Sequence, residues 1–419
     1  MQGDEYSSDK KYEVNDPHMP ISWGLLDHWE KMLRYQKYFR WAQDVNIAFI
    51  GDGIEYGGFI SEERFSPGFD FTVGAKGVDI KHADASVVES YHDTQVALSI
   101  VQPTCDASAG PGMAHLASTI PIRIIEDASD ETERVSVEML ALGIKKALDK
   151  KADVINISLD IKPLDNEQEA WQKPENIQVA KQLLAAVEEA YKQNVVIVLA
   201  SGNYAPNDNV PELFQRLLDH PGVITVGSYN ANNELASYSS HLNGVDILAA
   251  GGEPMTSEAC TPEHLWESKA LGIVLPSSEG DFVHSCAGTS FATPQVAAAA
   301  AIVIGEYKSC PYWSNSSLVI DCPSYTAINV RKAILNPYDI LKSQKAYYSD
   351  SSDVPTVVPA HLYEKAVASR QIEGKPKLDF FATECAAYEL IEDSSELDCT
   401  DSYELYPSLE SPDPNTLTD

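Results

Sequence analysis

Short hydrophobic runs alternate with longer amphipathic segments along most of the chain. The short continuous runs predict buried strands, and they cover residues 45–50, 153–159, 195–200 and 222–227. The longer segments predict helices, and they cover residues 136–152, 175–194 and 291–307. Continuous apolar strands separated by helices are typical of a parallel sheet that is covered on both faces. The pattern therefore predicts an α/β fold of three layers, with a mostly parallel central sheet and helices on both faces.

Segments of different composition flank this alternating pattern. We expect an N-terminal extension over residues 1–43, in which an aromatic-rich helix at 22–42 packs on the main domain. The main domain is expected at 44–345, and a C-terminal extension at 346–419. Because no Lys or Arg follows Lys377 while acidic residues continue to the end, we expect this acidic tail to be partly disordered.

Composition limits the classes of partner. The 419 residues carry a net charge of −33, which disfavours nucleic acid and anionic membrane surfaces and favours cationic peptides. The chain lacks a run of about 18 apolar residues that would suggest a membrane span, and its polar start lacks the apolar core of a signal peptide. Seven scattered cysteines without a CxxC pair argue against a disulfide framework. These features favour an intracellular, cytoplasmic location.

The first strand ends in Gly51-Asp52-Gly53, and two interpretations of this turn compete. A dinucleotide-binding loop needs the spacing G-x-G-x-x-G and a helix directly after it. Here the third glycine is Gly57, one residue too late, and the residues that follow have no helical pattern. We therefore favour a strand end that offers the Asp52 carboxylate to an active site, because sites in such sheets form beyond the carboxyl ends of the strands.

Three further residues are candidates for chemistry, and each has a simpler structural role beside the functional one. Ser290, in "CAGTSFATPQV", begins a helix with Pro294 in its expected first turn, and it is either an N-cap or an exposed nucleophile. His92 stands at a helix start, where it is either structural or a base. Asn203 follows a buried strand and is either a loop residue or an amide that binds a developing oxyanion.

Together these residues make the chain resemble the subtilisin-like serine peptidases, the subtilases, over about residues 45 to 310. The family's serine motif G-T-S-x-A-x-P is matched by Gly288 to Pro294, and its A-x-G-N motif by Ala200 to Asn203. Its histidine motif H-G-T-H-V-A-G is matched in part, by His92, Thr94, Val96 and Ala97.

The resemblance implies a serine endopeptidase that acts on peptides or proteins. Its implied site residues are a triad, an oxyanion-binding amide and a substrate-binding segment: Asp52, His92 and Ser290; Asn203; and Ser158, Leu159 and Asp160. No organic cofactor is implied, and although the family often uses calcium, no loop nominates a metal ligand. The alternative is a catalytically impaired subtilase fold, a pseudoprotease that serves as a binding or scaffold module.

The chain departs from the family pattern at the acid. An ungapped alignment puts Gly51 at the acid position of the D-[ST]-G motif, so that Asp52 lies one residue late. Since side chains alternate along a strand, this shift points the carboxylate to the other face unless a bulge at Gly51 corrects it. Asp93 replaces the glycine after the histidine, where it is either a helix N-terminal charge or a group that raises the pKa of His92. Asp160 stands where the family has a glycine, and it either narrows the cleft or selects basic side chains.

Overall fold

The computed structural model places the segments that build the predicted main domain, together with a few residues after it. The described residues are 42–55, 60, 62–73, 76–80, 92–101, 112–125, 136–159, 174–203, 212–239, 244–253, 260–264, 273–276, 282–309, 324–336, 371–372, 375–378 and 383. The predicted helix at 22–42 and the predicted disorder of the acidic tail lie almost wholly outside them.

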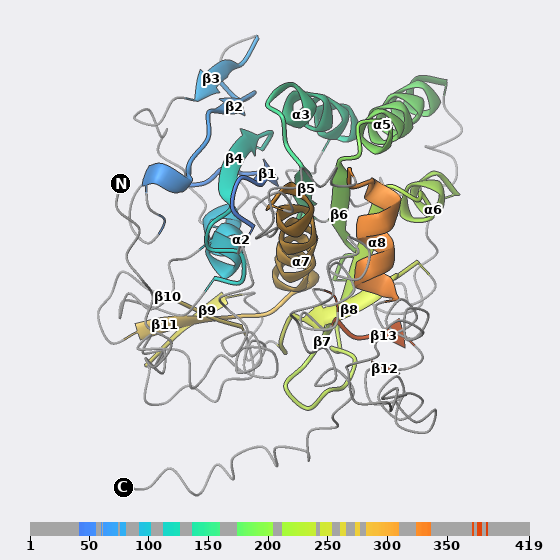
Figure 1. Ribbon diagram of the computed structural model, residues 1–419. Helices are drawn as coiled ribbons and strands as arrows, with labels where there is room; N and C mark the ends of the chain where they lie inside the picture. The colour runs from blue at the N-terminus through green and yellow to red at the C-terminus, as the bar shows by residue number, and fades with distance from the viewer. Residues whose placement is uncertain are drawn as a thin grey trace, which may run out of the picture.

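An eight-stranded sheet in the order β3-β2-β4-β1-β5-β6-β7-β8 lies at the centre of the fold (Figure 1). Its strands are β1 (Asn46–Gly51), β2 (Gly68–Asp70), β3 (Val78–Ile80), β4 (Ser118–Arg123), β5 (Val154–Ile157), β6 (Val196–Ala200), β7 (Val223–Tyr229) and β8 (Ile247–Ala250). Every neighbouring pair is parallel except β2 and β3. Because both faces of the central strands are buried, β1, β5 and β6 are apolar at nearly every position.

Helices cover both faces of the sheet, which confirms the predicted three-layer α/β fold. The helices are α2 (His92–Val101), α3 (Val137–Asp149), α5 (Pro174–Lys192), α6 (Glu212–Leu218), α7 (Thr289–Ser309) and α8 (Ala327–Leu335), with a short 3-10 turn, η2, at Glu62–Arg64. One core joins α2, α7 and α8 to the face that carries Ile47 and Phe49. A second core joins α3, α5 and α6 to the face that carries Ala48 and Ile50, as the alternation of side chains along a strand requires.

Smaller sheets lie outside this arrangement. The strands β9 (Cys260–His264), β10 (Ile273–Pro276) and β11 (Phe282–Cys286) form an antiparallel sheet just before α7, and β12 (Gln371–Ile372) pairs with β13 (Lys375–Pro376). Neither sheet was predicted. The predicted strands and helices of the main domain are confirmed with shifts of at most three residues at their ends.

A buried carboxylate ties three distant segments together at the amino end of β5. Asp153 accepts hydrogen bonds from the backbone N–H of Asn46 (2.9 Å), from Nζ of Lys308 (2.7 Å) and from the hydroxyl of Tyr325 (2.8 Å). Lys308 Nζ also donates to the Asp44 carbonyl at 2.8 Å, but the Asn46 N–H and the Tyr325 hydroxyl would need another partner if the carboxylate were removed, and hydrogen bonds to charged groups are the stronger kind.

Asp153→Ala is therefore expected to lower the free energy of unfolding by about 2–3 kcal/mol. Urea denaturation measures this change. The matched control is Asp149→Ala, which removes an exposed ion pair to Lys146 at 3.7 Å and should cost less than about 0.5 kcal/mol. Equal effects of the two variants would contradict a structural role for the Asp153 contacts.

Candidate active site

The predicted site residues gather at the carboxyl edge of the sheet. In the parallel register, Phe49 lies beside Asn156, and Ile157 lies beside Leu199. The segments that follow β1, β5 and β6 therefore leave the sheet at one edge, which α2 and α7 approach with their first residues. The rings of His92 and Phe291, at the starts of these two helices, have centroids 5.9 Å apart.

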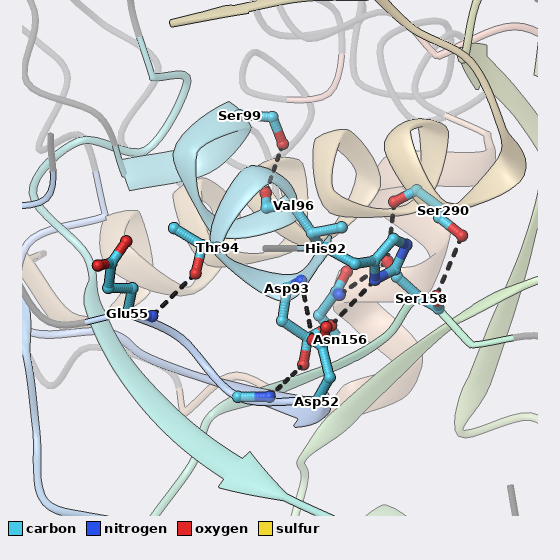
Figure 2. Close-up of polar contacts among 11 residues, drawn as sticks. Asp52, Glu55, His92, Asp93, Thr94, Val96, Ser99, Asn156, Ser158 and Ser290 are labelled. Carbon is cyan, nitrogen blue, oxygen red and sulfur yellow. Dashed lines mark hydrogen bonds and ion pairs between the residues drawn. The ribbon is translucent and has the colours of Figure 1, made fainter. Parts of the chain in front are cut away.

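Ser290 is the second residue of α7, and Ser158 holds it on both its side-chain and backbone groups (Figure 2). The Ser290 hydroxyl donates to the Ser158 carbonyl at 3.0 Å, and the Ser158 hydroxyl donates to the Ser290 carbonyl at 2.9 Å. The side-chain amide of Asn156 donates to the Ser158 hydroxyl at 3.0 Å and fixes its orientation. These bonds fix the start of α7 against the end of β5.

Pro294 explains why the Ser290 carbonyl accepts a bond from outside the helix. In an α-helix that carbonyl would accept from the N–H four residues later, and residue 294 is a proline, which has no N–H. The proline was predicted in the first turn, but α7 begins at Thr289, so that Pro294 is its sixth residue. The difference arises because the helix starts two residues earlier than the apolar pattern indicates.

Asn203 follows the end of β6 and lies against the start of α7. Its Oδ1 accepts hydrogen bonds from the backbone N–H and the hydroxyl of Thr289, both at 2.9 Å. These two donors identify the oxygen of the amide and therefore leave Nδ2 as the group that faces Gly288. A Cβ on Gly288 would lie 3.5 Å from Asn203 Nδ2 and 3.7 Å from the Ser290 backbone nitrogen. Two N–H donors thus border the same small space beside the serine.

His92 is the first residue of α2, and 28% of its side chain is exposed. Its Nδ1 lies 3.4 Å from Oδ1 of Asp93. Burial of the ring lowers the pKa of His92, but the hydrogen bond and charge of Asp93, together with the charge of Asp52, outweigh it. The net effect raises the pKa of His92 above its ordinary value.

Asp52 and Asp93 are both buried, with 2% of each residue exposed, and they contact each other through the backbone. Asp52 Oδ1 accepts from the backbone N–H of Asp93 at 2.9 Å, and Asp93 Oδ2 accepts from the N–H of Gly53 at 3.3 Å. A third bond, from the N–H of Glu55 to the hydroxyl of Thr94 at 2.8 Å, joins the same two segments. The turn after β1 is therefore held against the first turn of α2.

The bulge that was considered at Gly51 is not present. β1 and β4 pair residue for residue through Gly51 and Arg123, whereas a bulge would place two residues opposite one. One oxygen or nitrogen of each of Asp52, His92 and Asp93 lies within 4.8 Å of the others. Because an oxygen of each carboxylate accepts a backbone N–H, we nominate no metal ligand from this group.

The structure brings Ser290, Ser158 and Asn203 together around the start of α7, and Asp52 with His92 at the start of α2. Leu159 is buried directly after Ser158, and Asp160 lies outside the described residues. Two residues with clear contacts were missed as site members: Thr289, which fixes the Asn203 amide, and Asp93. The signal for Asp93 was present in the sequence, because the chain has an acid at position 93, where the family motif has a glycine, and a glycine at position 51, where the motif has an acid.

One cysteine outside the site differs from the expectation drawn from the cysteine spacing. Cys286, at the end of β11, is disulfide-bonded. Linear spacing fails here because residues far apart in sequence can become neighbours on adjacent strands. Separately, none of the described helices is both long and apolar enough to span a membrane.

Comparison with known proteins agrees with the fold. A model of the subtilase family matches residues 43–349. Subtilisin E of Bacillus subtilis is 26% identical over 230 residues, which are 55% of this chain and 49% of that protein. An intracellular serine protease of Paenibacillus polymyxa is 24% identical over 268 residues, which are 62% of this chain and 67% of that protein. The chain thus spans about half the length of the first of these relatives.

Solved structures show the same fold at lower identity. A protease of Pseudoalteromonas arctica superimposes with a TM-score of 0.57 at 20% identity, covering 89% of this chain and 99% of the other. The nisin leader peptidase of Lactococcus lactis superimposes with a TM-score of 0.57 at 17% identity, covering 88% of this chain and 95% of the other.

Proposed function

Because the chain belongs to the subtilase family, we propose that it is a serine endopeptidase in which Ser290 is the nucleophile and His92 the general base. The observation that carries this proposal is the pair of N–H donors beside Ser290. Asn203 Nδ2 and the Ser290 backbone N–H border one small space, as a site that binds an oxyanion requires. The substrate class is peptides or proteins, and the net charge of −33 favours cationic ones.

Acylation begins with a rotation of the Ser290 side chain. Its hydroxyl leaves the Ser158 carbonyl and turns toward Nε2 of His92, while the released carbonyl accepts a backbone N–H of the substrate. The Ser290 oxygen attacks the scissile carbonyl carbon as its proton passes to Nε2. Asn203 Nδ2 and the Ser290 N–H stabilise the negative oxygen. The C–N bond then breaks, and the amine leaves with the proton from His92.

Deacylation repeats the same transfers with water. His92 takes a proton from the water while the water oxygen attacks the ester carbon. The tetrahedral intermediate collapses, the carboxylic acid product leaves, and the proton returns from His92 to the Ser290 oxygen. A carboxylate beside Nδ1 keeps the proton of the neutral ring on that nitrogen, so that Nε2 is free to accept. The acidic pair Asp52 and Asp93 supplies this carboxylate.

A fluorophosphonate probe tests the proposal directly, because it reacts with a serine only when a base and an oxyanion site activate it. We expect one covalent adduct on the folded wild-type chain, located at Ser290 by peptide mass spectrometry, and none on Ser290→Ala. The matched control is Ser99→Ala, which removes a hydroxyl of α2 that donates to the Val96 carbonyl, and it should label as wild type does. A folded wild-type chain that stays unlabelled would instead support the binding or scaffold module.

A further inference from the structure

The side chain of Asp93 occupies the space that a side chain at position 51 would need. A Cβ built on Gly51 would lie 2.6 Å from Asp93 Oδ1 and 2.7 Å from its Cγ, and closer still to Oδ2. Atoms cannot approach so closely, and the Asp93 carboxylate can therefore lie at the end of β1 only while residue 51 is a glycine.

From this placement we infer that Asp93, rather than a residue of β1 or the turn after it, is the carboxylate that orients His92. The inference rests on the proposed peptidase function and deepens it. The subtilase motifs have an acid at the end of the first strand, where this chain has Gly51. They have a glycine directly after the histidine, where this chain has Asp93. These two departures compensate each other, because the carboxylate has moved from the strand to the helix and remains at the same place beside the imidazole.

The contacts of Asp93 are those of an orienting acid. Its Oδ1 lies 3.4 Å from His92 Nδ1, and its Oδ2 accepts the N–H of Gly53 at 3.3 Å. In Figure 2 the two side chains lie next to each other at the start of α2, joined by a dashed line. A separation of 3.4 Å is long for a hydrogen bond, as is common for catalytic pairs before substrate binds.

Consecutive residues of a helix do not normally face each other, because each is rotated by about 100° from the last. His92 and Asp93 meet because they open α2 and because the Asp93 side chain turns inward over Gly51. Only 2% of Asp93 is exposed, and this burial strengthens its electrostatic effect on the ring. The absence of a side chain at Gly51 thus leaves the room that the Asp93 carboxylate occupies.

Asp52 has a different role in this arrangement. Its Oδ1 accepts the backbone N–H of Asp93 at 2.9 Å, as a capping carboxylate does at the first turn of a helix. Asp52 therefore positions the start of α2, and with it both His92 and Asp93. Burial lowers the pKa of His92, and the charge of Asp52 helps to raise it, after the larger contributions of the Asp93 hydrogen bond and charge.

The decisive experiment transfers the acid back to the strand. Asp93→Asn keeps the volume of the side chain but removes its charge, and we expect it to lower kcat by about 10⁴-fold. Gly51→Asp alone is expected to impair the enzyme as well, because its side chain collides with Asp93. Asp93→Gly alone should lose at least as much turnover as Asp93→Asn. The double variant Gly51→Asp/Asp93→Gly restores one carboxylate in the same space and should recover at least about 10²-fold of the turnover lost in Asp93→Gly, a strong departure from additivity.

A measurement that does not depend on turnover separates this inference from the peptidase proposal. With ¹⁵N-labelled histidine, NMR should show a downfield Nδ1–H resonance for His92 and a raised pKa in wild type. Both should be lost in Asp93→Asn and recovered in the double variant, whereas Asp52→Asn should keep the resonance. If the NMR results are as expected but the fluorophosphonate probe does not label the chain, the pairing of Asp93 with His92 stands and only the proposed peptidase function is refuted. A resonance that survives Asp93→Asn and disappears in Asp52→Asn would overturn the inference.

Discussion

His92→Ala is expected to lower kcat by about 10⁶-fold, and the double variant His92→Ala/Ser290→Ala should be no slower than either single variant. The reason is that the two side chains act as one unit. Without the imidazole, the Ser290 hydroxyl keeps its proton and its bond to the Ser158 carbonyl, so that removing the hydroxyl as well removes nothing further. The activity that remains comes from substrate binding and oxyanion stabilisation.

Steady-state hydrolysis of a mixed peptide library measures the effect, because such a library offers many cleavage sequences at once. The matched control is His220→Ala, which removes a partly buried imidazole that bonds to Glu188 at 3.1 Å on the far side of the fold and should keep kcat within about twofold. Additive losses in the double variant would contradict a joint role, and a His92→Ala enzyme with normal turnover would remove the base from the mechanism.

Asn203→Ala should lower kcat by about 10²–10³-fold with little change in KM or in folding. Thr289 fixes Oδ1 of the amide through two bonds of 2.9 Å, and Nδ2 therefore faces the space beside the Ser290 N–H without further rearrangement. A donor held in this way stabilises charge that develops only in the transition state, which is why kcat changes and KM does not. Asn203 is exposed, so its truncation leaves no buried cavity, and the loss of its two bonds from Thr289 should cost about 1–2 kcal/mol, which leaves the chain folded.

Two substitutions refine this test. Asn203→Asp keeps the shape and the acceptor for Thr289 but replaces the donor with a second oxygen, and it should lose at least as much turnover as the alanine variant. Thr289→Ser preserves both donors to Oδ1 and should stay near wild type. Unchanged turnover in Asn203→Ala, in an enzyme that still requires Ser290, would exclude the amide from oxyanion binding.

The central part of the fold was predictable because burial on both faces leaves a strong sequence signal. β1, β5 and β6 are apolar at nearly every position, and α3 and α5 carry the helical spacing between them. The antiparallel sheet β9–β11 was missed because polar residues interrupt β9 and β11, and the apolar run of β10 is only four residues long. The disulfide at Cys286 was missed for a related reason, since cysteine spacing along the chain does not show which strands become neighbours.

The candidate site was predictable where the motif is local. Gly288, Thr289 and Ser290 are consecutive, and their geometry follows from a single helix start. The acid that we propose, Asp93, was not predictable in this way, because its placement depends on how closely the first turn of α2 approaches the end of β1. From the sequence alone, Gly51 indicated a missing carboxylate and Asp93 an extra one. Only the overlap of the Asp93 carboxylate with the side-chain position of residue 51 connects the two.

The proline within α7 has a consequence for how Ser290, the proposed nucleophile, keeps its place. Because Pro294 offers no N–H, the Ser290 carbonyl is held by the hydroxyl of Ser158, directly after β5, and not by its own helix. Ser290 lies on α7 but is thus held by a residue outside that helix. Fraying or small shifts along the rest of that helix need not reach the reacting oxygen, whereas any peptide that displaces the end of β5 will move it at once.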